Sequence, residues 1–206
     1  MNDGYISILE KISSESPTPG GGTVAALTLA HAHSLAAMVS RLTIAKEKWY
    51  EGHEISNLII NSSAESLERS ILLAENDSLA FDKVMDSYRM PRNNDMEIKS
   101  RKLAILESTI GAAQTPSEIA HEGLKLLSLL PDLARFGNLN AITDLAASSE
   151  LAYTAVYIAS LNVKINVDSM SDKELDKIQD DNTIVLTKSK ELIMQIREIV
   201  SRRMEI

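Results

Sequence analysis

The segment from Gly20 to Ser40 contains no Asp, Glu, Lys or Arg, which limits where it can lie in a folded chain. It is long enough to span a bilayer, for which about 20 apolar residues are needed. Its residues are mostly Ala, Gly, Thr and Ser with two histidines, whereas a membrane span is rich in Leu, Ile and Phe. We therefore predict a helix buried inside the protein and expect no membrane partner.

Prolines and glycines are sparse, and the stretches between them have helical character. The 206 residues include 5 Pro and 8 Gly, and aromatic residues make up only 4 %, which favours helices over sheets. Only residues 162–168, where Val163, Ile165 and Val167 alternate with polar residues, have a strand-like pattern. The predicted helices cover residues 5–12, 23–46, 54–88, 95–114, 115–130, 138–161 and 173–203, with Asp95 and the sequence Ser171-Asp172-Lys173-Glu174 as capping signals.

These elements predict an all-α fold, a multi-helix up-and-down bundle that forms one domain over residues 1–206. A chain of this length suits one large domain, and no repeat or low-complexity linker divides it. The formal net charge of -8 argues against a nucleic-acid partner, because nothing offsets phosphate repulsion. The absence of cysteine excludes disulfides and thiolate metal sites. Together with the lack of signal-peptide features at the start, it leads us to expect a cytoplasmic protein.

The glycine turn, which we define as residues 16–23 (Ser-Pro-Thr-Pro-Gly-Gly-Gly-Thr), is the first candidate site. Its glycines leave backbone N–H groups uncovered at a helix start, where the helix dipole also favours an anion. The alternative is a tight turn whose glycines only permit close packing. The candidate binding residues here are Ser16, Pro19, Gly20, Gly21 and Gly22.

Asp77 is the second candidate, because it lies on or beside an apolar helical stripe. Its helical neighbours include Leu73, Ala80, Phe81 and Val84. A carboxylate among such residues is costly unless it is paired, hydrated or facing a cavity, and burial would raise its pKa toward that of a general acid or base. The alternative is an aspartate at the core boundary that reaches water.

A third group of candidates lies elsewhere in the chain. Asp144 falls near a predicted helix start among small residues, which suits either a pocket wall or a favourable charge for the helix dipole. Asn138 and Asn140 precede it and can bind a ligand or cap the helix. Lys46 and Lys48 follow the charge-free helix, as anion-binding side chains or as an ordinary cationic helix end.

Metal and nucleotide sites are disfavoured by the remaining motifs. His31 and His33 are two residues apart, which places them on different sides of a helix. Glu118 and His121 form one Glu-x-x-His motif, whereas a di-iron bundle needs two. The sequence has no phosphate-binding loop, dinucleotide fingerprint or nucleophile elbow. We therefore expect no metal and no cofactor.

Taken together, the glycine turn and the blocks after it resemble the formiminotetrahydrofolate cyclodeaminase and methenyltetrahydrofolate cyclohydrolase family. The turn is the most specific match, and the resemblance covers about residues 5 to 170. Thr143 departs mildly from the serine usual before the second aspartate. The other matching blocks are Asp77 with Ala80, Phe81 and Val84, then Pro91 with Arg101, Gly137-Asn138 with Thr143-Asp144, and Asn162 to Asn166.

The resemblance implies an all-α bundle, usually a homodimer, that acts on a tetrahydrofolate derivative with or without a polyglutamate tail. On this basis we assign acid/base catalysis to Asp144, and pterin orientation or a second proton transfer to Asp77. Asn138 and Asn140 would bind the pterin or the one-carbon group. The glycine turn would face a substrate carboxylate, with Lys46 and Lys48 attracting the glutamate tail.

Two reactions fit this resemblance. The cyclohydrolase converts 5,10-methenyltetrahydrofolate to 10-formyltetrahydrofolate, and the cyclodeaminase closes 5-formiminotetrahydrofolate with loss of ammonia. We favour the cyclohydrolase, because the chain has no room for the formiminotransferase domain that accompanies the cyclodeaminase in bifunctional members. A more distant alternative is a non-catalytic helical module for anion binding or assembly, which would not need Asp77 and Asp144 in one cleft.

Overall fold

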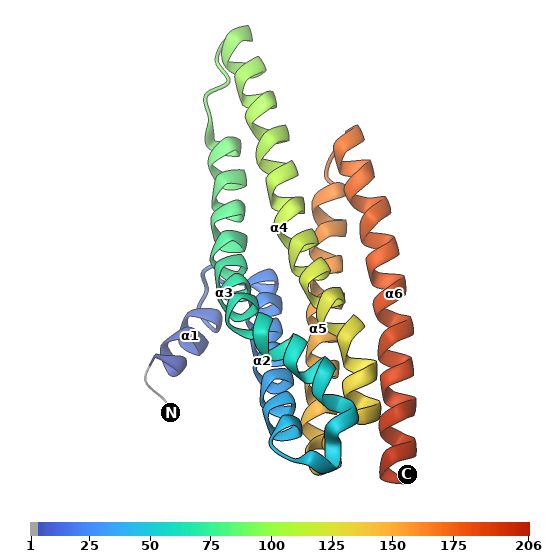
Figure 1. The fold of residues 1–206 in the computed structure, drawn as a ribbon. Helices are drawn as coiled ribbons and strands as arrows, with labels where there is room; N and C mark the ends of the chain where they lie inside the picture. The colour runs from blue at the N-terminus through green and yellow to red at the C-terminus, as the bar shows by residue number, and fades with distance from the viewer. Residues whose placement is uncertain (1–3) are drawn as a thin grey trace.

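The computed structural model describes residues 4–206, which fold into an antiparallel helical bundle (Figure 1). Within this range there is no β-strand, so the predicted all-α bundle is confirmed. The elements are α1 (Tyr5–Ile12), α2 (Gly21–Ile44), the 3₁₀ segment η1 (Glu47–Gly52), α3 (His53–Arg89), α4 (Asp95–Phe136), the 3₁₀ segment η2 (Leu139–Ala141), α5 (Ile142–Val167) and α6 (Lys173–Met204).

The five long helices pack around a core made mainly of small and branched side chains. Helix α2 packs between α3 and α5, and α4 contacts α3, α5 and α6. The ends of α3 and α4 that meet at residues 90–94 project beyond the other helices, and α1 lies to one side of the bundle (Figure 1). Alanines such as Ala25, Ala36, Ala152 and Ala159 are fully buried, which lets these helices approach closely.

The charge-free helix α2 lies inside the bundle, as predicted. It is the one helix in residues 4–206 that is long and apolar enough to cross a membrane, and 61 % of its most apolar stretch is buried within the protein. Thirteen of its residues are buried, including Leu29 and Val39. Its lack of charge is therefore explained by packing against α3 and α5.

Helix α4 is continuous from Asp95 to Phe136, and the predicted break at residues 114–115 is wrong. Pro116 lies within the helix and cannot donate to the carbonyl of Ala112, four residues earlier. Asn166 of α5 takes over this role, because its side-chain amide donates to the Ala112 carbonyl at 2.8 Å. A contact from a distant helix thus replaces the missing backbone bond. Pro131 also lies inside α4.

Residues 162–168 belong to the end of α5, and the predicted strand is wrong. Val163 and Val167, one helical turn apart, are buried together with Ala113 of α4 and Leu175 of α6. Ile165, which a strand would place on their face, is 72 % exposed. The helix therefore continues because its period buries the two valines between α4 and α6.

Two helix starts test the predicted capping signals. Helix α4 is capped by Asn94 rather than by Asp95, since the Asn94 side chain accepts a hydrogen bond from the backbone N–H of Glu97. Asp172 caps α6 by accepting from the backbone N–H of Glu174, as the sequence around it indicates. The predicted start of α6 is confirmed.

Candidate functional site

A cleft of about 230 Å³ opens at the N-terminal end of α2. The glycine turn forms one wall, α3 contributes the side with Asp77, and the C-terminal end of α5 closes the third side. The lining residues are Pro17, Thr18, Gly20, Gly21, Gly22, Asp77, Ala80, Phe81, Ala112, Asn162, Ile165 and Asn166. Four segments that are far apart in the sequence therefore meet around one hollow.

Asp77 projects from the middle of α3 onto the first turn of α2. Its Oδ2 accepts a hydrogen bond from Thr23 Oγ1 at 3.1 Å, and Ser78 Oγ lies 3.0 Å from the same hydroxyl. The backbone N–H of Thr23 also donates to this carboxylate. The first N–H groups of a helix have no partner within the helix, and Gly20 offers no side-chain cap. Asp77 therefore caps α2 from a neighbouring helix.

Opposing effects set the protonation of Asp77. Burial in the half-open cleft raises the pKa of the Asp77 carboxyl, whereas the side-chain and backbone hydrogen bonds from Thr23 lower it. Burial is the larger effect, so the pKa of Asp77 lies above its ordinary value. A half-buried carboxyl with a raised pKa is suited to accept and return a proton.

Gly22 is the glycine of the turn on which this geometry depends. A Cβ atom at Gly22 would overlap the Asp77 carboxylate, so only glycine lets α3 bring this group onto the helix start. Gly21 differs, because a Cβ there would meet Asn162 Nδ2 and Ile158 Cγ2 at ordinary contact distances of 3.8 and 3.9 Å. The sequence presented close packing at the glycines and an uncovered helix start as alternatives. Both are present, because Gly22 packs against Asp77 and all three glycines line the cleft.

Asn162 and Asn166 line the cleft, although we had not selected them as site residues. They lie one helical turn apart near the end of α5, and the Asn166 side chain donates to the carbonyls of Ala112 and Asn162 at 2.8 and 3.0 Å. Asn162 donates to the Ile158 carbonyl at 2.9 Å. The strand-like pattern concealed this arrangement, whereas a spacing of four within a helix would have indicated it.

The remaining candidates of the glycine turn differ in their relation to the cleft. Gly20 and Gly21 line it, whereas Ser16 is exposed and neither Ser16 nor Pro19 is among the lining residues. The anion placed at the start of α2 is the Asp77 carboxylate. A substrate carboxylate would therefore share this helix start with Asp77.

The third group of candidates lies at the opposite end of the bundle. Asp144 is in the first turn of α5, eighteen residues before Asn162, which corresponds to about 27 Å along the helix. Lys46 and Lys48 are exposed beyond the other end of α2, and the Lys48 ammonium lies 4.8 Å from the centre of the Trp49 ring. One chain therefore brings Asp77 and the turn together but does not bring Asp144 or the lysines to them.

Asn138 and Asn140 also lie at this distant end. Asn138 is buried, its backbone N–H donates to Thr43 Oγ1 at 3.0 Å, and its side-chain amide donates to the Leu42 carbonyl at 3.0 Å. Its side-chain oxygen accepts from the backbone N–H of Asn140, which is itself exposed. These bonds tie the segment before α5 to the end of α2.

Comparison with known proteins identifies the fold and its relatives. The sequence profile of the family described as formiminotransferase-cyclodeaminase matches residues 5–182, which is most of the chain. The chain belongs to this family. Its crystal-structure relatives include formiminotetrahydrofolate cyclodeaminase from Thermotoga maritima, with a TM-score of 0.79 and 25 % identity over 96 % of this chain and 93 % of that one. The resemblance drawn from the glycine turn is therefore confirmed.

Two kinds of curated protein in the formiminotransferase-cyclodeaminase family match this chain. A methenyltetrahydrofolate cyclohydrolase from Methylorubrum extorquens is 33 % identical over 84 % of this chain and 83 % of its own length. The mouse formimidoyltransferase-cyclodeaminase is 28 % identical over 80 % of this chain, but the match spans only 30 % of that larger protein. The chain thus corresponds to most of the former and to about three tenths of the latter.

Proposed function

We propose that this protein hydrolyses 5,10-methenyltetrahydrofolate to 10-formyltetrahydrofolate. The observation that carries the proposal is the Asp77 carboxyl, which is held on the start of α2 within a cleft and has a raised pKa. The family relationship supplies the substrate class, since the relative that matches over most of both chains is named a methenyltetrahydrofolate cyclohydrolase. That name also favours an enzyme over a non-catalytic binding module.

The reaction needs proton transfers at one carbon. Water attacks the methenyl carbon while Asp77 accepts one of its protons, which gives a tetrahedral carbon bonded to N5 and N10. The bond from this carbon to N5 then breaks as Asp77 returns the proton to N5, and the hydroxyl proton is released to give the formyl group on N10. The Asp77 anion would also stabilise the cationic substrate. We assign Asp77 the main proton-transfer role, ahead of Asp144, because Asp77 is the aspartate that lines the cleft.

We further propose that the working form is a homodimer. The cleft of about 230 Å³ is smaller than the roughly 300–1,000 Å³ usual for ligand pockets, so one chain encloses only part of a folate. Neighbouring helices α2 and α5 carry uncharged stretches, residues 21–40 and 151–163. The exposed apolar side chains on or just beyond these stretches, which a second copy would cover, are Met38, Leu42, Tyr157, Leu161 and Ile165.

An antiparallel pairing of two chains would join the two groups of candidate residues. If the two-fold axis is perpendicular to α2, the start of α2 in one chain lies beside its end in the partner. Asp144 would then approach the partner's cleft, and Lys46 and Lys48 would be positioned to attract the anionic glutamate tail. The separation of Asp77 and Asp144 within one chain is the reason that we propose a shared site.

Mixing two inactive variants tests this shared site. We expect Asp77→Asn and Asp144→Asn each to have little activity, and their equal mixture, unfolded and refolded together, to recover about one quarter of the wild-type rate. The reason is that half of the dimers are mixed, and each mixed dimer has one site with both aspartates intact. The measurement is turnover per chain before and after mixing. A mixture no more active than its components would refute the exchange of residues between subunits.

The second candidate function is formiminotetrahydrofolate cyclodeaminase. It is favoured by the structural similarity to the Thermotoga maritima protein, whose match extends over nearly all of both chains. The same cleft would then remove a proton from N10 as it attacks the formimino carbon, and would protonate the departing ammonia. Neither reaction, in this form, requires a metal or redox step.

One optical assay distinguishes these functions. The chain is supplied in turn with 5,10-methenyl- and 5-formimino-tetrahydrofolate while absorbance of the methenyl group is followed. We expect loss of the methenyl signal above the uncatalysed rate for the first substrate. Appearance of the signal with the second substrate alone would assign the cyclodeaminase, and no change with either would reject an enzyme of this class.

A further inference from the structure

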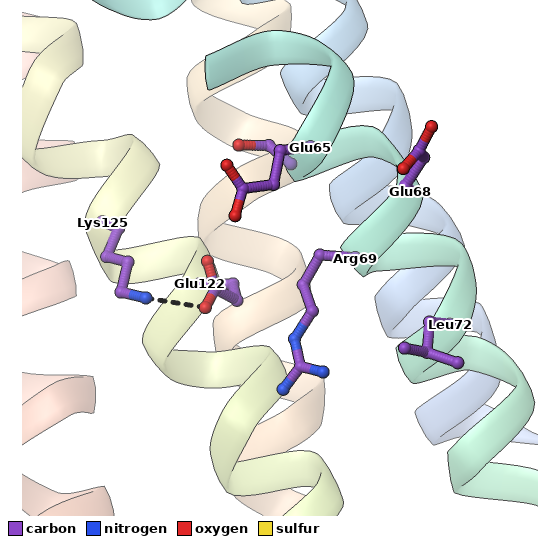
Figure 2. A pocket seen from close by; sticks show the side chains of 7 residues that line it. Glu65, Glu68, Arg69, Leu72, Glu122 and Lys125 are labelled. Atoms are coloured by element: carbon purple, nitrogen blue, oxygen red, sulfur yellow. Dashed lines mark hydrogen bonds and ion pairs between the residues drawn. The ribbon is translucent and has the colours of Figure 1, made fainter.

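Another cavity lies between α2, α3 and α4, away from the cleft at the start of α2. Its volume is about 350 Å³, and it continues into a groove of about 470 Å³ that shares Ser66, Glu122 and Lys125 with it. The groove is shown in Figure 2, where Glu65 and Arg69 of α3 face Glu122 and Lys125 of α4. His33 borders the cavity and lies eleven residues beyond Gly22, about 16 Å along α2.

His33 presents an unused hydrogen-bonding atom in this cavity. The residue is only 9 % exposed, and its Nε2 atom is buried with no hydrogen-bond partner. Burial lowers the pKa of His33 to about 4, although Glu122 opposes this through its negative charge. The imidazole is therefore neutral at neutral pH, and a neutral imidazole has one nitrogen that accepts a hydrogen bond.

The other polar groups of the cavity also act mainly as acceptors. The hydroxyls of Ser62, Ser63 and Ser128 donate to backbone carbonyls of their own helices, and Ser63 Oγ also accepts from the Arg41 guanidinium at 3.4 Å, so a ligand can use only the lone pairs that remain. The Glu122 side chain is 22 % exposed and is paired with Lys125 at 2.7 Å. The Lys125 side chain is 69 % exposed, so water competes for its ammonium group and this pair within one helix is weak.

The surrounding charge and apolar wall narrow the class of ligand. The groove is lined by three glutamates against Arg69 and Lys125, and Arg69 is also paired with Glu118 of α4. An anion is disfavoured there. Within residues 4–206 no three His, Asp or Glu side chains are grouped so as to hold a metal ion. The apolar side chains that line the cavity are Leu58, Ile59, Leu126 and Leu129.

We propose that this cavity binds an alkylammonium ion. The ammonium group would donate hydrogen bonds to Glu122 and to His33 Nε2, and the hydrocarbon chain would lie against the four apolar side chains. The ligand would replace Lys125 as the partner of Glu122.

Calorimetric titration of the full chain with n-butylammonium chloride tests this proposal. At neutral pH and constant ionic strength, we expect saturable binding of one ion per chain with a Kd of about 1 mM or tighter. Tetramethylammonium has the charge but no N–H donor, and butan-1-ol has the chain but no charge, so neither should bind.

Three variants separate the proposed site from general attraction of cations to an acidic protein. Glu122→Gln and His33→Leu should weaken butylammonium binding about tenfold or more, because the first removes the negative charge and the second removes an acceptor. Lys125→Met should strengthen binding, since it removes the competing cation. His31→Leu, at an exposed position of the same helix, is the matched control and should bind like wild type.

Folding and folate turnover of each variant are measured separately from ligand binding. His33→Leu should fold, as judged by circular dichroism, and retain wild-type folate turnover. Absence of saturable heat from the wild-type chain would mean that water alone fills the cavity and would overturn the proposal. Equal binding by wild type and Glu122→Gln, or weaker binding by Lys125→Met, would do the same.

Discussion

Replacement of Asp77 by asparagine is expected to lower turnover of the folate substrate by about 10²-fold or more, the usual scale for loss of an acid/base group. Asparagine has nearly the same shape and its side-chain oxygen can still accept the hydrogen bonds from Thr23. It cannot accept and return a proton under these conditions. The measurement is kcat, with KM determined in parallel to show whether substrate binding is retained.

The same substitution should not weaken the fold at neutral pH. The folded-state pKa of Asp77 is raised above its ordinary value of 3.8, so folding favours the protonated carboxyl. Its contribution to stability is full below that value and is lost as the pH rises through the raised pKa. At pH 7 the wild-type chain therefore carries the cost of a buried charge, and Asp77→Asn should be at least as stable.

Urea unfolding of both chains across the acidic range measures this linkage. The stability advantage of Asp77→Asn should be largest at neutral pH and should shrink as the pH falls toward 4. Low turnover together with unimpaired stability would identify Asp77 as a functional rather than a structural group. Wild-type turnover in a well-folded Asp77→Asn chain would remove the basis of the proposed reaction.

Substitution of Gly22 by alanine should abolish most activity through the same carboxylate. The added methyl group would overlap Asp77, so either the carboxylate or the start of α2 must move. We expect turnover to fall by about 10²-fold, similar to loss of the carboxyl itself, because a displaced proton-transfer group acts at the wrong position. Stability should also fall, since Thr23 loses its partner at the helix start.

Gly111→Ala is the matched control for this substitution. Gly111 lies inside α4, and a Cβ there would meet no atom within 4 Å. Alanine at that position should stabilise the helix by about 1 kcal/mol, with turnover unchanged. Thermal melting and kcat of the two variants give the comparison. Normal turnover in Gly22→Ala would show that the contact between the glycine and Asp77 has no part in the reaction.

Much of the fold could be predicted because its signals are local. The absence of charge in residues 20–40 indicated a buried helix, and Asp172 indicated the start of α6 through its capping geometry. The glycine turn and the position of Asp77 on an apolar stripe also identified two parts of the cleft. These features depend on composition, helical period and capping, which operate over a few neighbouring residues.

The features that could not be predicted depend on groups distant in the chain. Helix α4 passes through Pro116 because Asn166, fifty residues later, donates to the carbonyl that the proline leaves without a partner. Helix α5 continues past residue 162 because Val163 and Val167 become buried against α4 and α6. Local propensity is weak enough for such contacts to override it.

Contacts between distant parts of the chain also decided which residues make up the site. The sequence indicated that the glycine turn and Asp77 are unusual for their places, whereas the packing of α3 on α2 made Gly22 the glycine that leaves space for the Asp77 carboxylate. It could not show that Asp144 lies at the far end of α5 from the cleft, because helix lengths and directions set that separation. Backbone period and side-chain type are local properties, whereas which side chains share a cleft depends on how rigid helices pack.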